Sequence, residues 1–536
     1  MMNIIADFLF FMVLIICIIA KMKNKIEQSH NENQWDEKYG NILFIVVFLI
    51  SFFILTYKIG NIPQGLHVDE AGALYDAICL SKYGVDRYLY KLPVYFVNFG
   101  GGQNALYTYL AMIFIKIWGV SVTVFRLPAI VLSLFSIICL YKLIGENNSK
   151  KEALFTTFIF AVSPFFIMKS RWGLESYLMC SLMTISTFIL MRACCTNKSC
   201  WYILTGVFWG LTLYTYAIAY VVVPAVIGLV LLYNLLIKKV KIKNIILMAI
   251  PLGILAFPLI LMLVKNSQIL EKVEIPIFSI PKLWFYRGGE ISVKNIPENL
   301  KNIFDILFIK DFLNYNAIAE FGTLYKLSIP LVVFGLIEVG REVIKNVKQK
   351  KFSLDFVMLV SFGIIFLLGL CIAEVNINKI NAIYVPMVYF AGRFLVYISN
   401  KIKYVWIIVI LVYGLQCGIF LHYYFTKFGK TDLMHFENEI IEACQKAESL
   451  EKDNIYIENC VNQTYIYTLI ATPISPYEFN KNLQIENGIV TEYGKYKFQI
   501  PEKIDENAVY IIKNNLQKIE NGFQMEQYGE FYVIWK

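Results

Sequence analysis

Two adjacent carboxylates, Asp69 and Glu70, stand in the stretch "NIPQGLHVDEAGALYDA" at 61–77. The small and apolar residues that follow them predict a short helix, and Asp69 could cap its first turn. In a group transfer, a carboxylate takes or orients the proton of a hydroxyl or amine acceptor. A structural alternative makes Asp69 a helix cap and Glu70 a solvated neighbour. On the residues alone, both interpretations stay open.

Cationic side chains elsewhere in the chain could stabilise a departing phosphate. Arg171 and Glu175 are four residues apart in "SPFFIMKSRWGLESY" (163–177), so they would share one face of a helix. Lys379 stands just before an apolar run in "EVNINKINAIYVP" (374–386). The structural alternatives are an interfacial ion pair for the first two residues and a lysine that snorkels to the membrane surface for the third.

Two tyrosines, Tyr214 and Tyr216, lie where one apolar run ends and the next begins, in "LTLYTYAIAYVVVP" at 211–224. They are candidates for lining a site at that membrane face. The structural alternative is the belt of aromatic residues that membrane proteins place at the water interface.

Membrane spans must position these residues. The chain has 536 residues, of which 58% are hydrophobic and only 17% charged, whereas soluble domains carry about 25% charged residues. Its apolar blocks are near the ~20 residues that cross a bilayer, which predicts a polytopic α-helical membrane protein. The net charge of +9 needs no nucleic-acid partner, because most Lys and Arg residues sit in short loops where they set membrane topology.

The basic loops fix the expected number of spans, because such loops face the cytoplasm. All of them fall inside only if 104–118, which contains Lys116, lies flat at the membrane surface instead of crossing it. We therefore expect about twelve transmembrane helices plus this juxtamembrane helix. The twelve expected spans are 3–20, 41–57, 121–143, 152–169, 174–193, 201–218, 219–237, 243–264, 324–340, 354–373, 380–398 and 403–424.

Three domains follow from this topology. We expect an N-terminal extra span with a cytoplasmic linker (1–40), a transmembrane catalytic domain (41–425) and a small extracytoplasmic α/β domain (430–536). The catalytic domain would carry outer loops at 58–120 and 265–323. The topology places Asp69, Arg171, Tyr214 and Lys379 at one outer face, which favours a shared extracytoplasmic site.

No cofactor is certain from the sequence. The eleven cysteines show no metal-ligand spacing. A divalent metal held by Asp69 and Glu70 stays open.

An ordered set of short motifs resembles the dolichyl-phosphate-mannose protein mannosyltransferase superfamily of GT-C glycosyltransferases, which includes the bacterial aminoarabinose transferases. The resemblance covers roughly 40–425. The motifs are "DE" (69–70), "LYTYL" (106–110), "FRLP" (125–128), "SP…SRWGLE" (163–175), "GLTLYTY" (210–216) and "N-x-N-K-x-N…P" (376–386).

The resemblance implies an enzyme of a bacterial plasma membrane whose site faces away from the cytoplasm. Its donor would be a sugar linked to a polyprenyl phosphate, its acceptor a cell-surface glycan, lipid or protein, and transfer would invert the anomeric centre. The family's loop aspartate falls on Asp69, with Glu70 as its second member. Donor-site roles fall on Arg126, on Arg171 with Glu175, on Tyr214 with Tyr216, and on Lys379, where many members have arginine.

Two other functions remain as alternatives. A transporter or flippase of lipid-linked glycans would be expected to show internal repeats and charged, broken spans, whereas the predicted spans are nearly free of charge. A polymerase or ligase of surface polysaccharide would differ from a monosaccharide transferase in the size of the transferred unit.

Overall fold

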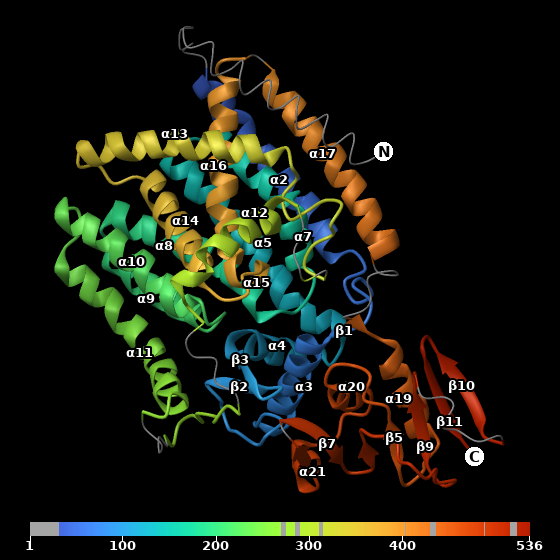
Figure 1. Ribbon diagram of the computed structural model, residues 1–536. Helices are drawn as coiled ribbons and strands as arrows, with labels where there is room; N and C mark the ends of the chain where they lie inside the picture. Colours follow the sequence, from blue (N-terminus) through green and yellow to red (C-terminus); the bar gives the residue numbers. More distant parts are fainter. Residues whose placement is uncertain are drawn as a thin grey trace. The chain divides into compact units, whose positions relative to one another are not determined.

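In the computed structural model the chain divides into two compact units (Figure 1). The helical unit comprises residues up to Tyr57 together with Ala129–Phe257 and Gly289–Phe428, and the loop–tail unit comprises Lys58–Pro128, Pro258–Gly288 and Gly429–Lys536. The structure describes residues 32–536 except 270–274, 285–289, 310–312, 314, 403, 429–435, 487 and 515–521. The predicted span 3–20 therefore lies outside the described residues.

Helices build the helical unit. Two of them, α5 and α11, also continue into the loop–tail unit along the chain. The helices are α2 (Glu32–Thr56), α5 (Val122–Asn147), α6 (Lys150–Ala161), α7 (Pro164–Lys169), α8 (Leu178–Thr196), α9 (Ser199–Leu213), α10 (Ala219–Leu236), α11 (Ile242–Asn266), α12 (Ile296–Phe308), α13 (Ser328–Lys348), α14 (Leu354–Cys371), α15 (Ile377–Ile380), α16 (Tyr384–Ser399) and α17 (Val405–Tyr423). Short 3₁₀ turns, η1 (Glu175–Tyr177), η2 (Val293–Asn295) and η3 (Asn381–Ile383), and one π turn, η4 (Tyr424–Phe428), connect or extend them.

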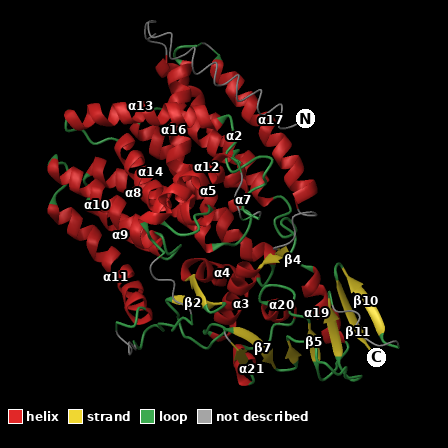
Figure 2. Ribbon diagram, in the orientation of Figure 1, coloured by secondary structure: helices red, strands yellow, loops and turns green. Residues whose placement is uncertain are grey.

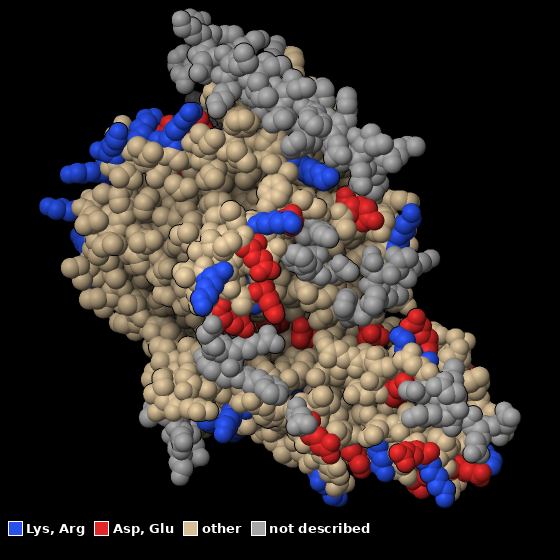
Figure 3. Space-filling view, in the orientation of Figure 1, with Lys and Arg blue, Asp and Glu red and all other residues tan. Residues whose placement is uncertain are grey.

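The helices confirm a multi-pass membrane protein. Among the described residues, eight are long and apolar enough to cross a membrane. The left-hand flank of the helical unit in Figure 3 is almost free of charged side chains, whereas Lys and Arg gather near α13. The eight candidates are Tyr39–Thr56, Val122–Asn147, Glu175–Thr196, Ala219–Leu236, Ile242–Asn266, Leu354–Cys371, Ile377–Ser399 and Val405–Phe428.

Three predicted spans, 152–169, 201–218 and 324–340, are not among these candidates, and the number of twelve is not confirmed. The first is broken because the Ser163 side chain accepts the backbone N–H of Phe166 and caps a new helix. The second ends early at Leu213. In the third, α13 runs on through the basic stretch that was expected to be a loop, ending at Lys348.

The loop–tail unit contains every strand of the described residues (Figure 2). Its elements are β1 (Leu66–His67), α3 (Val68–Tyr83), β2 (Tyr95–Asn98), β3 (Gly101–Asn104), α4 (Ala105–Trp118), β4 (Phe436–Glu437), α19 (Glu439–Ser449), β5 (Ile455–Ile457), α20 (Thr464–Ala471), α21 (Pro476–Lys481), β6 (Gln484–Glu486), β7 (Ile489–Tyr493), β8 (Tyr496–Lys497), β9 (Val509–Ile512), β10 (Gln524–Tyr528) and β11 (Phe531–Trp535).

A seven-stranded sheet organises the C-terminal part, in the order β10-β11-β9-β5-β8-β7-β6. Strand β5 is parallel to both of its neighbours, and the other pairs are antiparallel. The core includes Tyr510, Ile512 and Ile534, and α19 packs against β9, β10 and β11. These elements confirm the predicted α/β tail.

The tail belongs to one compact unit with residues 58–128. Helix α3 packs against α20, and β1 pairs with β4. A Cβ at Gly65 would lie 2.7 Å from the backbone carbon of Glu437. Only glycine allows that approach, and its φ of +79° suits no other residue well.

Helix α4 has the properties expected of a juxtamembrane helix. Its 14 residues span about 21 Å at 1.5 Å per residue, which is short of the ~30 Å bilayer core. Ile113, Ile117 and Trp118 expose 47%, 62% and 60% of their surface, so one apolar side is available to lipid.

Candidate functional site

The acidic pair lies in the first turn of α3, but Asp69 is not its cap. His67 occupies that position, and its Nδ1 accepts the backbone N–H of Asp69 at 3.2 Å. In return, the His67 backbone N–H lies 3.4 Å from Oε2 of Glu70. The alternative that made Asp69 the helix cap is therefore wrong, because the His67 imidazole caps α3. The helix N-terminus still favours both negative charges.

Glu70 is held in a buried ion pair with Arg126, and neither side chain is exposed. The Arg126 Nε and Nη2 donate to Oε1 and Oε2 of Glu70, each at 2.9 Å. Nη1 and Nη2 also donate to the carbonyls of Ile59, Pro63 and Gly65 at 2.9–3.0 Å. Glu70 is thus no solvated neighbour. All three guanidinium nitrogens of Arg126 donate to Glu70 or to the loop before α3. This placement favours a structural role for Arg126 over the predicted contact with a donor phosphate.

Asp69 has the opposite environment, with 37% of its side chain exposed. Its Oδ1 lies 3.4 Å from Nδ2 of Asn98, and its Oδ2 lies 3.6 Å from Nδ1 of His67. Nε2 of Gln103 donates to the Asp69 backbone carbonyl at 3.3 Å. Of the two adjacent carboxylates, Asp69 is therefore the one that solvent reaches.

A second buried ion pair lies further along α3 and was missed by the sequence analysis. Nε and Nη2 of Arg87 donate to Oδ1 and Oδ2 of Asp76 at 3.0 and 2.7 Å, and Nη1 donates to Oη of Tyr465 on α20 at 3.2 Å. Burial raises the pKa of the neighbouring Asp86 to about 8, and the charge of Asp76 adds to the rise. The adjacent acid and base in "GVDRY" were the only sequence signal.

Arg171 lies in the helical unit, fully buried. Its Nη1 donates to the carbonyls of Ile54 and Leu55 at 2.6 and 2.9 Å, and its Nη2 donates to the carbonyl of Tyr57 at 2.7 Å. These carbonyls end α2, where the helix itself supplies no donors. The guanidinium also lies 4.9 Å from the ring centre of Phe425. This placement favours an anchor for the end of α2.

The outer junction at 175–177 and the segment around Lys379 are joined within the helical unit. Nδ2 of Asn381 donates to the Ser176 carbonyl at 2.9 Å, and Glu175, which begins η1, is buried. Nζ of Lys379 donates to the carbonyl of Ala373 at 2.7 Å and pairs with Glu290 at 3.2 Å. The structure thus brings two predicted donor-site segments together.

Tyr214 and Tyr216 also belong to the helical unit, and both are half-buried. Oη of Tyr214 donates to the Leu255 carbonyl on α11 at 2.7 Å. The predicted residues therefore divide between the units. Asp69, Glu70 and Arg126 belong to the loop–tail unit, and Arg171, Glu175, Tyr214, Tyr216 and Lys379 belong to the helical unit.

A metal shared by the acidic pair does not fit this geometry, because both carboxylate oxygens of Glu70 accept from Arg126. Within the described ranges, no three His, Cys, Asp or Glu side chains gather as metal ligands. We assign no step to a metal.

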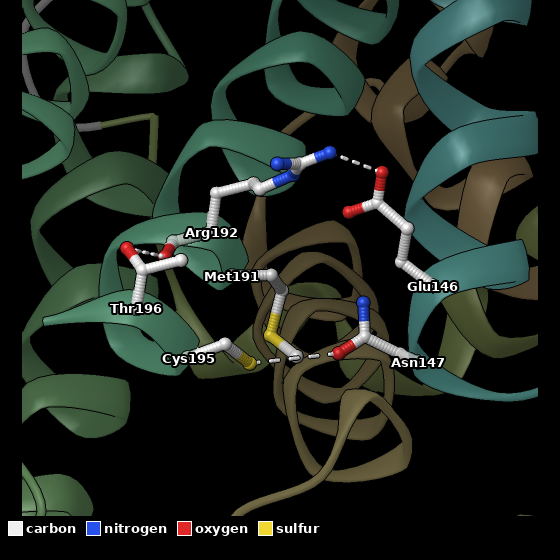
Figure 4. A pocket seen from close by; sticks show the side chains of 6 residues that line it. All are labelled: Glu146, Asn147, Met191, Arg192, Cys195 and Thr196. Carbon is white, nitrogen blue, oxygen red and sulfur yellow. Dashed lines mark hydrogen bonds and ion pairs between the residues drawn. The ribbon is translucent and has the colours of Figure 1, made fainter.

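A cavity of about 300 Å³ lies between the C-terminal ends of α5 and α8 (Figure 4). Arg192 faces Glu146 in an ion pair there, and Sγ of Cys195 lies 3.7 Å from Oδ1 of Asn147. The cavity contains none of the predicted site residues, so it is not the predicted site.

Comparisons with known proteins agree with the motifs. A model of the dolichyl-phosphate-mannose-protein mannosyltransferase family matches residues 104–263. No curated protein gives a significant match.

Several solved structures are similar over most of the chain. ArnT from Cupriavidus metallidurans in the apo state has a TM-score of 0.55 and 12% identity, covering 92% of this chain and 97% of that chain. The same protein bound to undecaprenyl phosphate gives 0.56 and 11%, covering 93% and 98%. The oligosaccharyltransferase of Archaeoglobus fulgidus, tethered with an acceptor peptide, gives 0.50 and 10%, covering 82% and 63%.

At these identities the structural matches show a shared fold. The chain has the GT-C fold of ArnT, and its family-model match confirms the resemblance to the dolichyl-phosphate-mannose protein mannosyltransferase superfamily that the motifs predicted.

Proposed function

We propose that this protein transfers a sugar from a polyprenyl-phosphate-linked donor to an extracytoplasmic acceptor, with inversion of the anomeric centre. The observation that carries the proposal is the contrast within the acidic pair. Glu70 is locked to Arg126, whereas Asp69 remains more than one-third exposed. Two similar carboxylates in such different environments are suited to different roles.

The chemistry assigned to Asp69 is that of a base. It takes the proton of the acceptor hydroxyl or amine while that oxygen or nitrogen attacks the anomeric carbon. The bond from the anomeric carbon to the phosphate oxygen breaks, and the lipid phosphate leaves with the bonding electrons. The proton passes from Asp69 to water. One displacement of this kind inverts the anomeric centre.

The donor phosphate is proposed to meet Lys379 at the segment joined to 175–177. Its present partner, Glu290, is one-third exposed, so the lysine lies near water and could exchange that partner for a phosphate. Tyr214, Tyr216 and Glu175 are proposed to shape the donor site. The undecaprenyl phosphate bound to ArnT supports a lipid donor, and the peptide on the archaeal enzyme supports an acceptor outside the lipid. We place the site at the outer face of a bacterial plasma membrane.

The test is to compare the surface glycans, lipids and proteins of cells with and without this chain by mass spectrometry. We expect the loss of the chain to remove one sugar mass from one class of acceptor. The loss of a polymeric series would indicate a polymerase or ligase instead. Unchanged masses with lipid-linked glycan retained inside the cell would indicate a flippase. Either result would overturn the proposed transfer.

A further inference from the structure

One face of α3 carries a row of residues that continues from the acidic pair. Asp69, Gly72 and Asp76 are spaced by three and four residues, which places them on the same side of the helix. Asp69 at one end is exposed, and Asp76 at the other is buried in its pair with Arg87. Gly72 lies between a reactive carboxylate and a fixed cation.

Asn98 lies against this row. It is the last residue of β2, at the turn of the β2–β3 hairpin, and only 7% of its surface is exposed. Its Nδ2 is directed to Oδ1 of Asp69 at 3.4 Å. Its Oδ1 is buried and has no hydrogen-bond partner among the described residues. Buried amide oxygens normally have a partner, so this atom needs an explanation.

Gly72 gives the explanation. A Cβ on Gly72 would lie 2.5 Å from Oδ1 of Asn98 and 2.8 Å from Nη2 of Arg87. The amide oxygen and the guanidinium therefore approach the same point of the α3 backbone, and only glycine leaves room for both. Gly72 thus places the amide oxygen of Asn98 and the guanidinium of Arg87 beside each other on one side of α3.

The polarity of Asn98 matches its two neighbours. Its carbonyl end faces the guanidinium of Arg87, and its amino end faces the carboxylate of Asp69. Gln103 on β3 holds the Asp69 backbone carbonyl from the same hairpin. A half-exposed carboxylate can rotate, and a base that rotates loses the geometry on which its rate depends.

We propose that Asn98 is a positioning residue that links Arg87 to Asp69 and fixes which carboxylate oxygen faces the acceptor. This inference rests on the proposed function of Asp69. It concerns a residue that would touch neither donor nor acceptor.

The test is a double-mutant cycle on purified full-length protein with a polyprenyl-phosphate sugar as donor. We expect Asn98→Ala to lower kcat by about 10- to 100-fold while the KM for the donor and the midpoint of thermal unfolding stay unchanged. In an Asp69→Asn background, the same substitution should have little further effect, because the group that it positions is gone. Asn482→Ala, at an exposed asparagine of the same unit, is the matched control and should leave kcat unchanged.

A second measurement is needed if the turnover of Asp69→Asn is too low for a further loss to be measured. Asn98→Asp places a second negative charge beside Asp69, in surroundings that also contain His67, Glu70 and Arg87. That charge disfavours the ionised form of the base, so the acid limb of the pH dependence of kcat/KM should move to higher pH.

Three outcomes would overturn the inference. They are an unchanged kcat in Asn98→Ala, an equal fold-loss in both backgrounds, and an acid limb that does not move in Asn98→Asp. Failure of the proposed function can be distinguished from failure of this inference. In that case, Asp69→Asn alone would retain wild-type turnover.

Discussion

Glu70 and Arg126 form a two-point ion pair across 56 residues of sequence, and neither side chain reaches solvent. The pair ties the start of α3 to the first turns of α5, and the remaining bonds of Arg126 hold the loop that precedes α3. Asp69 therefore lies on a helix turn that the buried Glu70–Arg126 pair holds in place. The adjacent carboxylates therefore differ in role. Glu70 stabilises the fold, and Asp69 is the carboxylate in contact with solvent.

Asp69→Asn should abolish most of the activity without unfolding the protein. The amide keeps an oxygen that Asn98 can bond, and the His67 cap does not depend on the charge. General acid–base groups contribute about 10²–10⁴-fold, so turnover should fall by that factor while donor binding persists. Turnover of purified proteins matched for folded amount measures this effect. Asp453→Asn, at an exposed aspartate, is the control. Comparable turnover by Asp69→Asn and wild type would exclude Asp69 as the base.

Arg126→Ala should destabilise the protein. The change leaves the carboxylate of Glu70 buried without its cation, which costs about 3–5 kcal/mol in comparable pairs. The thermal unfolding midpoint in detergent should fall clearly, whereas Arg341→Ala, which breaks an exposed pair with Glu338, should change little. If Arg126 bound the donor phosphate instead, the midpoint would hold and the KM for the donor would rise.

Lys379→Ala should weaken use of the donor. Its ammonium group is the proposed contact for the lipid phosphate, and a charge-assisted bond is lost with it. The KM for the donor should rise several-fold, and Lys379→Arg should restore it, because arginine keeps the charge and adds donors. The comparison is Arg171→Ala, which should lower the unfolding midpoint by releasing the end of α2. A donor KM that is identical in wild type and Lys379→Ala would leave Lys379 as a partner of Glu290 alone.

Glu437 gives the loop–tail unit a pH dependence. Burial raises its pKa from 4.5 to about 7, and the nearby charges of Glu439 and Glu530 act in the same direction, against Lys513. Between these values the folded state holds a proton that the unfolded state has released, so stability should fall as the pH rises from 4.5 through 7.

Unfolding midpoints at pH 5 and pH 8 test this prediction. Glu437→Gln should lose less stability than wild type over that interval, because it has no proton to release. The exposed Glu502→Gln should behave as wild type. An equal loss in wild type and Glu437→Gln would assign the dependence to other groups.

Local pattern was enough to predict the membrane class, the α/β tail and the acidic pair. It was not enough to assign roles within the pair, because these depend on Arg126, which reaches Glu70 only through the fold. The predicted span 152–169 is not a single long helix, because the Ser163 side chain caps a new helix inside this apolar block. Asn98 was not predicted as a site residue. The Gly72 contact that gives Asn98 its importance exists only in three dimensions.

The pairing of β1 with β4 sets an order on biosynthesis. Leu66 and its contact Tyr467 are separated by 401 residues, so the outer loop is made long before the segment that completes it. Until the tail has been synthesised, the side of α3 that packs against α20 lacks its cover. A chain stopped near 428 could insert its described membrane helices but would leave the loop around Asp69 unclosed. Synthesis of β4 and α20 thus determines when the nascent protein completes the surroundings of its acidic pair.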